Sequence, residues 1–376
     1  MDRACLESSD LRIGFDARLL GSLGIGRYIG GLLPALADLL ADRLVIVARP
    51  TDVALVHALT EGRGLIIPCD APPYRFSEQS VLLVKLLRAR LRLVHFPHYS
   101  LPIAYPGRFV ATIHDLFSYQ FPEIHSGLIP RRVNRLLLGN GIRRASAIIT
   151  PSQATSTAIL DRYPAARGKI TVIAEAADVR FHPGRNPAGE TAWLKYYGIT
   201  RPYYLYLGQW KAYKNVPLLL EAFRRVQAQG QDCQLVLAGQ DPRHPEVPAA
   251  AARLPSGSVV LPGRLPDDAV PDLYRAAAAV VVPSLAEGFG LPVLEAMACA
   301  VPVVCSEIPV LQEVAGTTAI FCDPADPDSF ARGMLAALKL RSDPHWSEQV
   351  LARARGFSWR RAAEQTVEVY ERALAD

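Results

Sequence analysis

Short apolar runs rich in β-branched residues recur along the whole chain, and each is followed by a longer stretch in which apolar residues have helical spacing. Strands that are apolar without interruption are buried on both faces, as in parallel sheets covered by helices. The alternation therefore predicts an α/β fold with two doubly wound parallel sheets. The expected strands span residues 11–15, 44–48, 93–96, 109–114, 147–151, 170–173, 204–208, 234–239, 259–263, 280–283, 302–305 and 319–323.

The domain boundary is expected near the middle of the chain. A length of 376 residues fits two domains of ordinary size. Residues 178–190 are rich in proline, glycine and charge and have no apolar period. We expect a linker there, between a first domain over residues 1–180 and a second over residues 190–358.

Composition excludes several classes of protein. The longest uncharged apolar run, residues 276–286, is far shorter than the roughly 20 residues that cross a bilayer, and residues 1–10 do not have the pattern of a secretory signal. We therefore expect a cytoplasmic protein. Its six cysteines include no CxxC pair, which favours reduced, buried thiols over disulfides or metal ligands. The net charge of +5 favours anionic small-molecule partners and is too weak to indicate nucleic acid.

A glycine-rich segment follows the first expected strand and contains Gly24, Gly26, Arg27 and Tyr28. Glycines before a helix allow backbone N–H groups to approach a phosphate at the positive end of the helix dipole. The dinucleotide pattern GxGxxG is broken, because Ile29 stands where the third glycine is needed, and this disfavours an NAD-dependent dehydrogenase. The segment is either a phosphate loop or a tight turn.

Histidines in the first half have two interpretations each. His114 ends an expected strand, where its ring could donate to a sugar hydroxyl or a phosphate, or could satisfy local hydrogen bonds. His95 and His98 have no evident third ligand, so we do not expect a metal site there. Asp326 and Asp328 match a DxD motif in letters, but they are better explained as a helix cap and a first-turn acid.

Two of the six lysines follow one expected strand of the second half. Lys211 and Lys214 come after Gly208 and immediately before an expected helix. Flexible ammonium groups at a helix start suit a diphosphate, although a solvated loop is the alternative.

The strongest motif follows the strand at 280–283. It runs from Ser284 through Glu287 to Glu295, and Pro292 stands where a helix would begin. The backbone of Gly288, Phe289, Gly290 and Leu291 could meet an anion flanked by the two carboxylates. Helix capping explains one glutamate but not two with this glycine spacing.

Together these motifs resemble the retaining glycosyltransferases of family GT4, which have the GT-B fold. Glu287 and Glu295 look like the family's E-x7-E signature, Lys211 and Lys214 resemble its basic pair, and Gly24–Tyr28 looks like its acceptor-side loop. Residues 357–374 resemble the closing helix, which implies that residues 359–376 pack back on the first domain. The segments RIGFDAR, GIGRY, HFPHYSLP and TIHDL look most like bacterial polysaccharide mannosyltransferases. One departure is Gln209, which stands where many members have arginine.

The resemblance implies two Rossmann-like domains that face a crevice, with a nucleotide-diphosphate sugar in the second. Glu295 would accept from the ribose, Lys211 and Lys214 would neutralise the diphosphate, and the backbone from Gly288 to Leu291 would hold phosphate and sugar. Glu287 would bind sugar hydroxyls, with Gly208 and Ser284 lining the donor site. His114, Glu287, Lys211 and Lys214 are the expected catalytic residues, and no cofactor or metal is expected.

We therefore expect a mannosyltransferase that uses GDP-mannose and a lipid-linked oligosaccharide. The alternatives are a UDP-sugar donor in the same fold and a sugar-nucleotide-binding protein without transfer. Residues 81–92 place Lys85, Arg88 and Arg92 among leucines, which predicts binding to an anionic membrane surface. A core-facing helix with a solvated basic side explains the same pattern.

Overall fold

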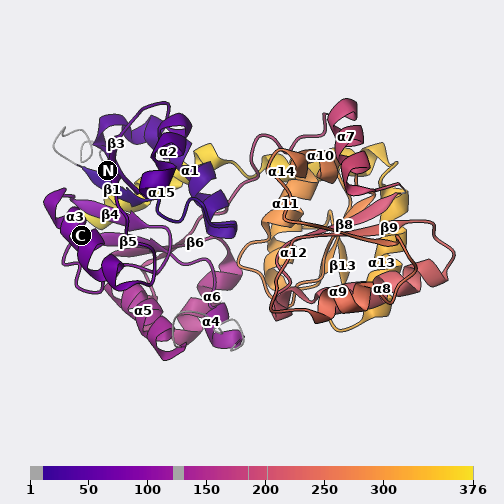
Figure 1. Ribbon diagram of the computed structural model, residues 1–376. Helices are drawn as coiled ribbons and strands as arrows, with labels where there is room; N and C mark the ends of the chain where they lie inside the picture. The colour runs from indigo at the N-terminus through magenta and orange to yellow at the C-terminus, as the bar shows by residue number, and fades with distance from the viewer. Residues whose placement is uncertain (1–11, 122–130, 185, 201, 376) are drawn as a thin grey trace. The chain divides into compact units, whose positions relative to one another are not determined.

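The computed structural model describes residues 12–121, 131–184, 186–200 and 202–375. The chain forms two compact units, Met1–Ala176 with Ser358–Asp376, and Ala177–Phe357 (Figure 1). Residues 1–10, which include Cys5, lie outside the described residues. The expectation about a secretory signal concerns these residues.

The first unit is built on a parallel sheet of seven strands in the order β3-β2-β1-β4-β5-β6-β7. Chain order reverses between β1 and β4, so the loops after these two strands diverge there. The strands are β1 (Ile13–Asp16), β2 (Leu44–Ala48), β3 (Leu65–Pro68), β4 (Leu93–Phe96), β5 (Phe109–Thr112), β6 (Ala147–Thr150) and β7 (Ile170–Val172).

Helices cover both faces of this sheet. One face packs against α1 (Gly24–Leu40) and the C-terminal helix α15 (Trp359–Ala375). The other packs against α3 (Leu83–Arg88), which follows the π-helical turn η4 (Glu78–Leu82), and α5 (Arg131–Arg144). Gly31 permits the contact between α1 and α15, because a Cβ there would lie 2.1 Å from the Trp359 ring. The remaining α-helices are α2 (Val53–Leu59), α4 (Phe117–Gln120) and α6 (Gln153–Arg162).

The second unit repeats the architecture with a parallel sheet of six strands, in the order β10-β9-β8-β11-β12-β13. Here the chain order reverses between β8 and β11. The strands are β8 (Tyr203–Leu207), β9 (Gln234–Ala238), β10 (Val259–Gly263), β11 (Ala279–Val282), β12 (Val303–Ser306) and β13 (Ile320–Cys322). The helices are α7 (Pro187–Tyr197), α8 (Val216–Ala228), α9 (Glu246–Ala251), α10 (Ala269–Ala276), α11 (Leu291–Ala298), α12 (Pro309–Ala315), α13 (Pro327–Leu340) and α14 (Pro344–Arg355).

The expected α/β fold with two parallel sheets is confirmed, and so is the return of the last helix to the first unit. Two expectations about elements were wrong. Strand β3 was not predicted, since its four half-exposed residues form too weak a pattern at the sheet edge. The expected linker lies within the second unit, and it is helical from Pro187 onward, where Asn186 caps α7 by accepting from the N–H of Gly189.

None of the helices in the described ranges combines the length and apolar character that a membrane span requires.

Candidate functional site

The predicted residues of the second unit gather where its chain order reverses. Gly208, Lys211 and Lys214 follow β8, and the segment from Ser284 to Leu291 follows the neighbouring β11. The N–H of Leu285 donates to the carbonyl of Tyr213 at 2.7 Å and joins the two loops. In open α/β sheets this is the place where ligands bind.

Glu287 is the centre of this site. Lys214 Nζ donates to Glu287 Oε1 at 2.6 Å, and Ser284 Oγ donates to the same oxygen at 2.7 Å. The Glu287 side chain is only 9% exposed. Its other oxygen, Oε2, has no hydrogen bond to any residue that the structure describes. The carboxylate is therefore held from one side and offers one oxygen for a further donor.

The two lysines share an aromatic neighbour. The Nζ atoms of Lys211 and Lys214 lie 5.8 and 5.5 Å from the centre of the Tyr213 ring, which is close enough for a cation–π attraction to each. Tyr206, on β8, donates its hydroxyl proton to the carbonyl of Gln209 at 2.7 Å. Burial, with a smaller contribution from the negative charge of Glu287, raises the pKa of Tyr206 well above its usual value. Tyr206 is therefore neutral at physiological pH.

The glycine loop leads into α11 at an unusual backbone angle. Gly290, the residue before the helix, has φ of 102°, and a Cβ there would lie 2.6 Å from Leu311. Glycine is required at this position because residues with a Cβ rarely adopt so positive a φ. Among the described residues, no acceptor receives the N–H of Phe289 or of Gly290, so both groups remain available to an anion. The Phe289 side chain is buried and packs edge-on against Phe357, with ring centres 5.9 Å apart.

Glu295 occupies a different environment from Glu287. It is the fifth residue of α11, which begins at Leu291 and has Pro292 as its second residue. Glu295 is 2% exposed, and its Oε2 accepts from the Tyr274 hydroxyl of α10 at 2.9 Å.

Sequence reasoning missed several residues that shape this site, namely Tyr206, Tyr213, Gly239 and Tyr274. Gly239 has φ of 130°, and a Cβ there would lie 1.9 Å from the carbonyl oxygen of Gly208. A glycine directly after β9 was a usable signal, since backbones approach closely at such positions. The tyrosines carry no comparable signal, because their roles depend on neighbours distant in sequence.

The glycine-rich segment of the first unit is part of a helix. Gly24, Gly26, Arg27 and Tyr28 are all residues of α1, so the expectation of a loop before the helix was wrong. Gly26 is needed for packing, because a Cβ there would lie 2.3 Å from the carbonyl oxygen of Leu20, whereas nothing lies within 4 Å at Gly24. Tyr28 is 2% exposed, and its hydroxyl lies 3.0 Å from Thr112 Oγ1. Its side chain thus belongs to the core.

His114 has protein partners at both ring nitrogens. Nδ1 lies 3.2 Å from Glu175 Oε1, and Nε2 lies 3.0 Å from the carbonyl oxygen of Pro97. Both partners are acceptors, so both hydrogen bonds form together only when the ring is protonated. Burial alone lowers the pKa of His114, but Glu175 and the Pro97 carbonyl outweigh it, so the pKa is raised above its usual value. Of the two sequence interpretations, the geometry favours local hydrogen bonding.

A buried ion-pair network follows β1 and was not predicted. Arg18 binds Asp16 through two donors, at 2.8 and 2.7 Å, and binds Glu78 Oε1 at 2.9 Å. It also donates to the carbonyl of Ala71, and Ser100 Oγ donates to Glu78 at 2.7 Å. Arg18 and Glu78 are 2% and 0% exposed. The spacing of Asp16 and Arg18 after a strand was a usable signal, but Glu78 had none.

The two histidines considered for a metal have separate surroundings. His95 Nδ1 lies 2.6 Å from the Tyr370 hydroxyl, and its Nε2 lies 2.7 Å from Thr112 Oγ1. Burial, with a smaller effect of His114, lowers the pKa of His95 to about 3, so the ring is neutral. His95 is buried and His98 is half-buried, and His98 contacts the Tyr74 hydroxyl at 3.1 Å.

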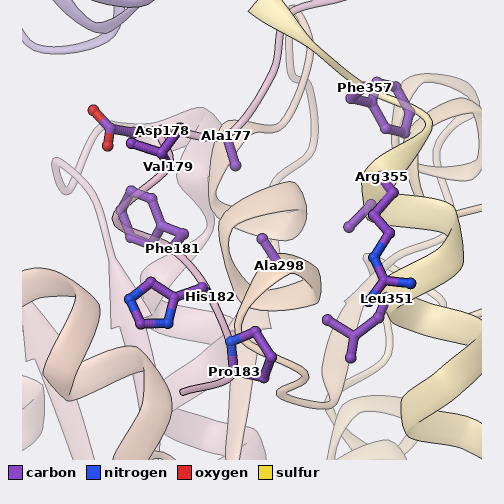
Figure 2. Close-up of a pocket in the computed structure, with 11 residues that line it drawn as sticks. Ala177, Asp178, Val179, Phe181, His182, Pro183, Ala298, Leu351, Arg355 and Phe357 are labelled. Carbon is purple, nitrogen blue, oxygen red and sulfur yellow. The ribbon is translucent and has the colours of Figure 1, made fainter. Parts of the chain in front are cut away.

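The second unit also has a pocket of about 230 Å³, whose lining includes Ala298 of α11 and Phe357, the ring neighbour of Phe289. Figure 2 shows Phe181 and His182 on one side of Ala298, and Leu351 and Arg355 of α14 on the other. None of the site residues predicted from sequence lines it.

Comparisons with known proteins agree with the fold and identify the family. A model of the glycosyl transferases group 1 matches residues 196–350, and a model of glycosyltransferase family 4 matches residues 23–181. The chain is 33% identical over 289 residues to the O-antigen chain mannosyltransferase B of Escherichia coli, covering 74% of each chain. It is 30% identical over 287 residues to a D-inositol 3-phosphate glycosyltransferase of Frankia alni, covering 71% of this chain and 69% of the relative.

One solved structure, Anabaena Alr3699/HepE in complex with UDP-glucose, superposes with a TM-score of 0.75 at 19% identity and covers 96% of this chain and 99% of that one. Two parallel α/β sheets with a last helix on the first unit, together with these matches, define an enzyme of the GT-B glycosyltransferase class. Within that class, the chain belongs to glycosyltransferase family 4.

Proposed function

We propose that this glycosyltransferase moves mannose from GDP-mannose to a lipid-linked oligosaccharide, with retention of configuration, in the synthesis of a bacterial surface polysaccharide. The observation that carries the proposal is the Glu287 carboxylate, which Lys214 and Ser284 hold through one oxygen while Oε2 has no partner among the described residues. A sugar hydroxyl is a suitable donor for that oxygen. The mannosyltransferase named above supports mannose as the sugar.

The donor is proposed to lie along the loops after β8 and β11. Lys214 donates one ammonium proton to Glu287. Its remaining protons and the charge of Lys211 are proposed to neutralise a diphosphate. The N–H groups of Phe289 and Gly290, together with the start of α11, contribute further positive potential. Gly208 and Gly288 keep the approach free of side chains, Leu291 begins the helix, and Glu295 accepts from the ribose.

Retention is proposed to occur on one face of the sugar. The leaving phosphate takes the proton of the acceptor hydroxyl as the new bond forms, and the lysines and loop amides stabilise its developing negative charge. The start of α1, with Gly24 and Arg27, is proposed to contribute on the acceptor side. Because the proposed acceptor is lipid-linked, sugar transfer is proposed to take place at the cytoplasmic face of the plasma membrane.

One other donor has specific support. The Alr3699/HepE structure holds UDP-glucose, which favours a UDP-sugar donor in the same site.

Radiolabelled GDP-mannose, UDP-glucose and UDP-N-acetylglucosamine separate these proposals. The purified protein is incubated with each donor, first without acceptor, to measure binding and slow hydrolysis, and then with a lipid-linked oligosaccharide. We expect binding, hydrolysis and transfer with GDP-mannose, and an α-linked product by NMR. Turnover of a UDP-sugar alone identifies the alternative donor, and binding without turnover of any of the three donors contradicts the proposed function.

A further inference from the structure

The side chain of Phe289 joins the glycine loop to the segment that follows α14. Phe289 is 5% exposed, and its ring meets the ring of Phe357 edge-on, with centres 5.9 Å apart. The backbone N–H groups of Phe289 and Gly290, which have no acceptor among the described residues, are proposed above to bind the diphosphate. The ring contact therefore holds a residue whose backbone is a proposed ligand of the donor.

Phe357 is itself held by Arg353 of α14. The guanidinium carbon of Arg353 lies 5.2 Å from the centre of the Phe357 ring, which is close enough for a cation–π attraction. Arg353 Nε donates to the carbonyl of Val314 at 3.0 Å, and its Nη2 donates to the carbonyl of Glu313 at 2.5 Å. Both carbonyls belong to the last turn of α12, so this helix fixes the guanidinium against which the Phe357 ring packs.

The same helix contacts the glycine loop directly. A Cβ on Gly290 would lie 2.6 Å from Leu311 of α12. Two consecutive residues of the loop are therefore braced against α12, Gly290 through Leu311, and Phe289 through the rings and guanidinium of Phe357 and Arg353. A loop braced at two consecutive residues has little freedom to move its backbone N–H groups.

Core packing alone does not explain the place of Phe357. Its side chain is half-buried and lines the pocket of the second unit together with Leu351 and Arg355 (Figure 2). Within the described ranges, Phe289 and Arg353 are the two partners of its ring. A side chain that served only the core would be enclosed on all sides, because protein interiors are close-packed.

We propose that Phe357 is a positioning residue for the donor diphosphate, which acts through Phe289 to fix the N–H groups of Phe289 and Gly290. Backbone donors stabilise the charge that develops on a leaving phosphate only when they are held in place before the reaction. A displacement of about 1 Å is enough to lose much of that effect. The inference rests on the proposed donor site and adds to it a residue that the sequence analysis assigned to the closing helix.

Hydrogen exchange of the ligand-free protein tests the brace itself. The N–H groups of Val293 and Leu294 donate to the carbonyl of Gly290 at 2.9 and 3.4 Å, so their exchange reports how firmly the loop is held. Phe357→Ala should raise both exchange rates about tenfold, since it removes an aromatic pair. Phe357→Tyr keeps the ring and should restore rates close to those of the wild type. Unchanged exchange in Phe357→Ala overturns the inference whatever the donor is.

Trp346→Phe is the matched control on α14. Trp346 is 7% exposed, and its indole N–H donates to the carbonyl of Thr318 at 3.1 Å. Its loss disturbs α14 without removing the contact between Phe289 and Phe357. The exchange of Val293 and Leu294 should therefore stay at the wild-type rate, and an equal rise in this control would overturn the inference.

Titrations followed by NMR test the consequence for the donor site, with GDP, UDP, guanosine and uridine as ligands. Phe357→Ala should bind the preferred diphosphate about tenfold more weakly than the wild type does, and the matching nucleoside equally well, because only the phosphates meet the loop. Phe357→Tyr should recover the affinity for the diphosphate. An equal loss for diphosphate and nucleoside overturns the inference, and so does a wild type that binds neither diphosphate. Diphosphate binding that depends on Phe357, in a protein that transfers no mannose from GDP-mannose, contradicts the proposed function and leaves this inference standing.

Discussion

At the scale of single residues, the two glutamates of the signature are held in different ways. Glu287 pairs with a lysine and a serine at the carboxyl ends of two adjacent strands, whereas Glu295 is buried in α11 beside Tyr274. In the proposed function they meet different parts of one extended donor.

Glu295→Ala should raise the donor KM with a smaller change in kcat, because hydrogen bonds to the ribose are made equally in the ground and transition states. Glu287→Ala should lower kcat by about 30-fold to 1000-fold, or roughly 2 to 4 kcal/mol, since it disturbs the sugar at its reacting geometry. Donor titrations at saturating acceptor measure both, and Tyr274→Phe controls for the surroundings of Glu295. If Glu287→Ala changes only KM while Glu295→Ala abolishes kcat, the proposed placement of the sugar beside Glu287 and of the ribose beside Glu295 is wrong.

The pair formed by His114 and Glu175 should make the stability of the first unit depend on pH. The folded pKa of His114 is raised, so its contribution is fully present below the unfolded value of about 6.5 and is lost as pH rises through the folded pKa. Glu175→Gln should therefore destabilise more at pH 6 than at pH 9, and NMR titration should show a lower pKa for His114. Glu246→Gln, at the exposed partner of His244, is the matched control and should have little effect at either pH. An equal effect of Glu175→Gln at both pH values would contradict the assignment.

At the scale of elements, the start of α1 shows how a glycine pattern can have two causes. Gly26 is required by the turn before the helix, while the surroundings of Gly24 are open. Packing therefore explains one of the two glycines and leaves the other without a structural reason.

Gly26→Ala should destabilise the first unit by about 2 kcal/mol, because the new Cβ would meet the Leu20 carbonyl. Gly24→Ala should change stability by less than about 1 kcal/mol, in the stabilising direction. Chemical denaturation measures both. If Gly24 also approaches a bound phosphate, Gly24→Ala should raise the KM of an acceptor without loss of stability. Unchanged kinetics would remove Gly24 from the proposed acceptor side.

The start of α11 and the two lysines are proposed to replace a divalent ion. Sugar transfer should therefore survive excess EDTA, because backbone N–H groups and ammonium groups compensate the diphosphate charge. Initial rates with and without the chelator test this. A loss of activity that magnesium or manganese restores would show that the charge is compensated in another way.

At the scale of the whole molecule, the chain leaves its first unit at Ala176 and returns to it at Ser358. The last helix packs on α1, and its Tyr370 is fully buried, with the hydroxyl bonded to His95. The C-terminus is thus part of the core of the first unit.

Tyr370→Phe should destabilise the first unit by about 1 to 3 kcal/mol, since it leaves a buried ring nitrogen of His95 without its partner. Tyr204→Phe is the matched change in the second unit, where the hydroxyl donates to the carbonyl of Met334 at 3.0 Å. Urea unfolding monitored by hydrogen exchange should show that each variant loses stability only in the unit that carries the substitution. Destabilisation of both units by either variant would contradict two separate cores.

The sequence by itself determined the described strands except β3, and it determined the loops after β8 and β11. Continuous apolar runs such as Leu44–Ala48 and Leu93–Phe96 become buried strands with those bounds, because only a covered parallel sheet can bury both of their faces. The glycine and proline of residues 290–292 likewise mark the start of α11, because their backbone preferences are local.

Only the tertiary structure decided which side chains meet. Lys214 and Glu287 are 73 residues apart, Arg18 and Glu78 are 60, and His95 and Tyr370 are 275. Their pairing depends on which strands are neighbours in each sheet, and apolar periodicity does not encode strand order. The same limit applies to Tyr28, whose burial follows from the packing of α1 on the sheet and not from the glycines beside it.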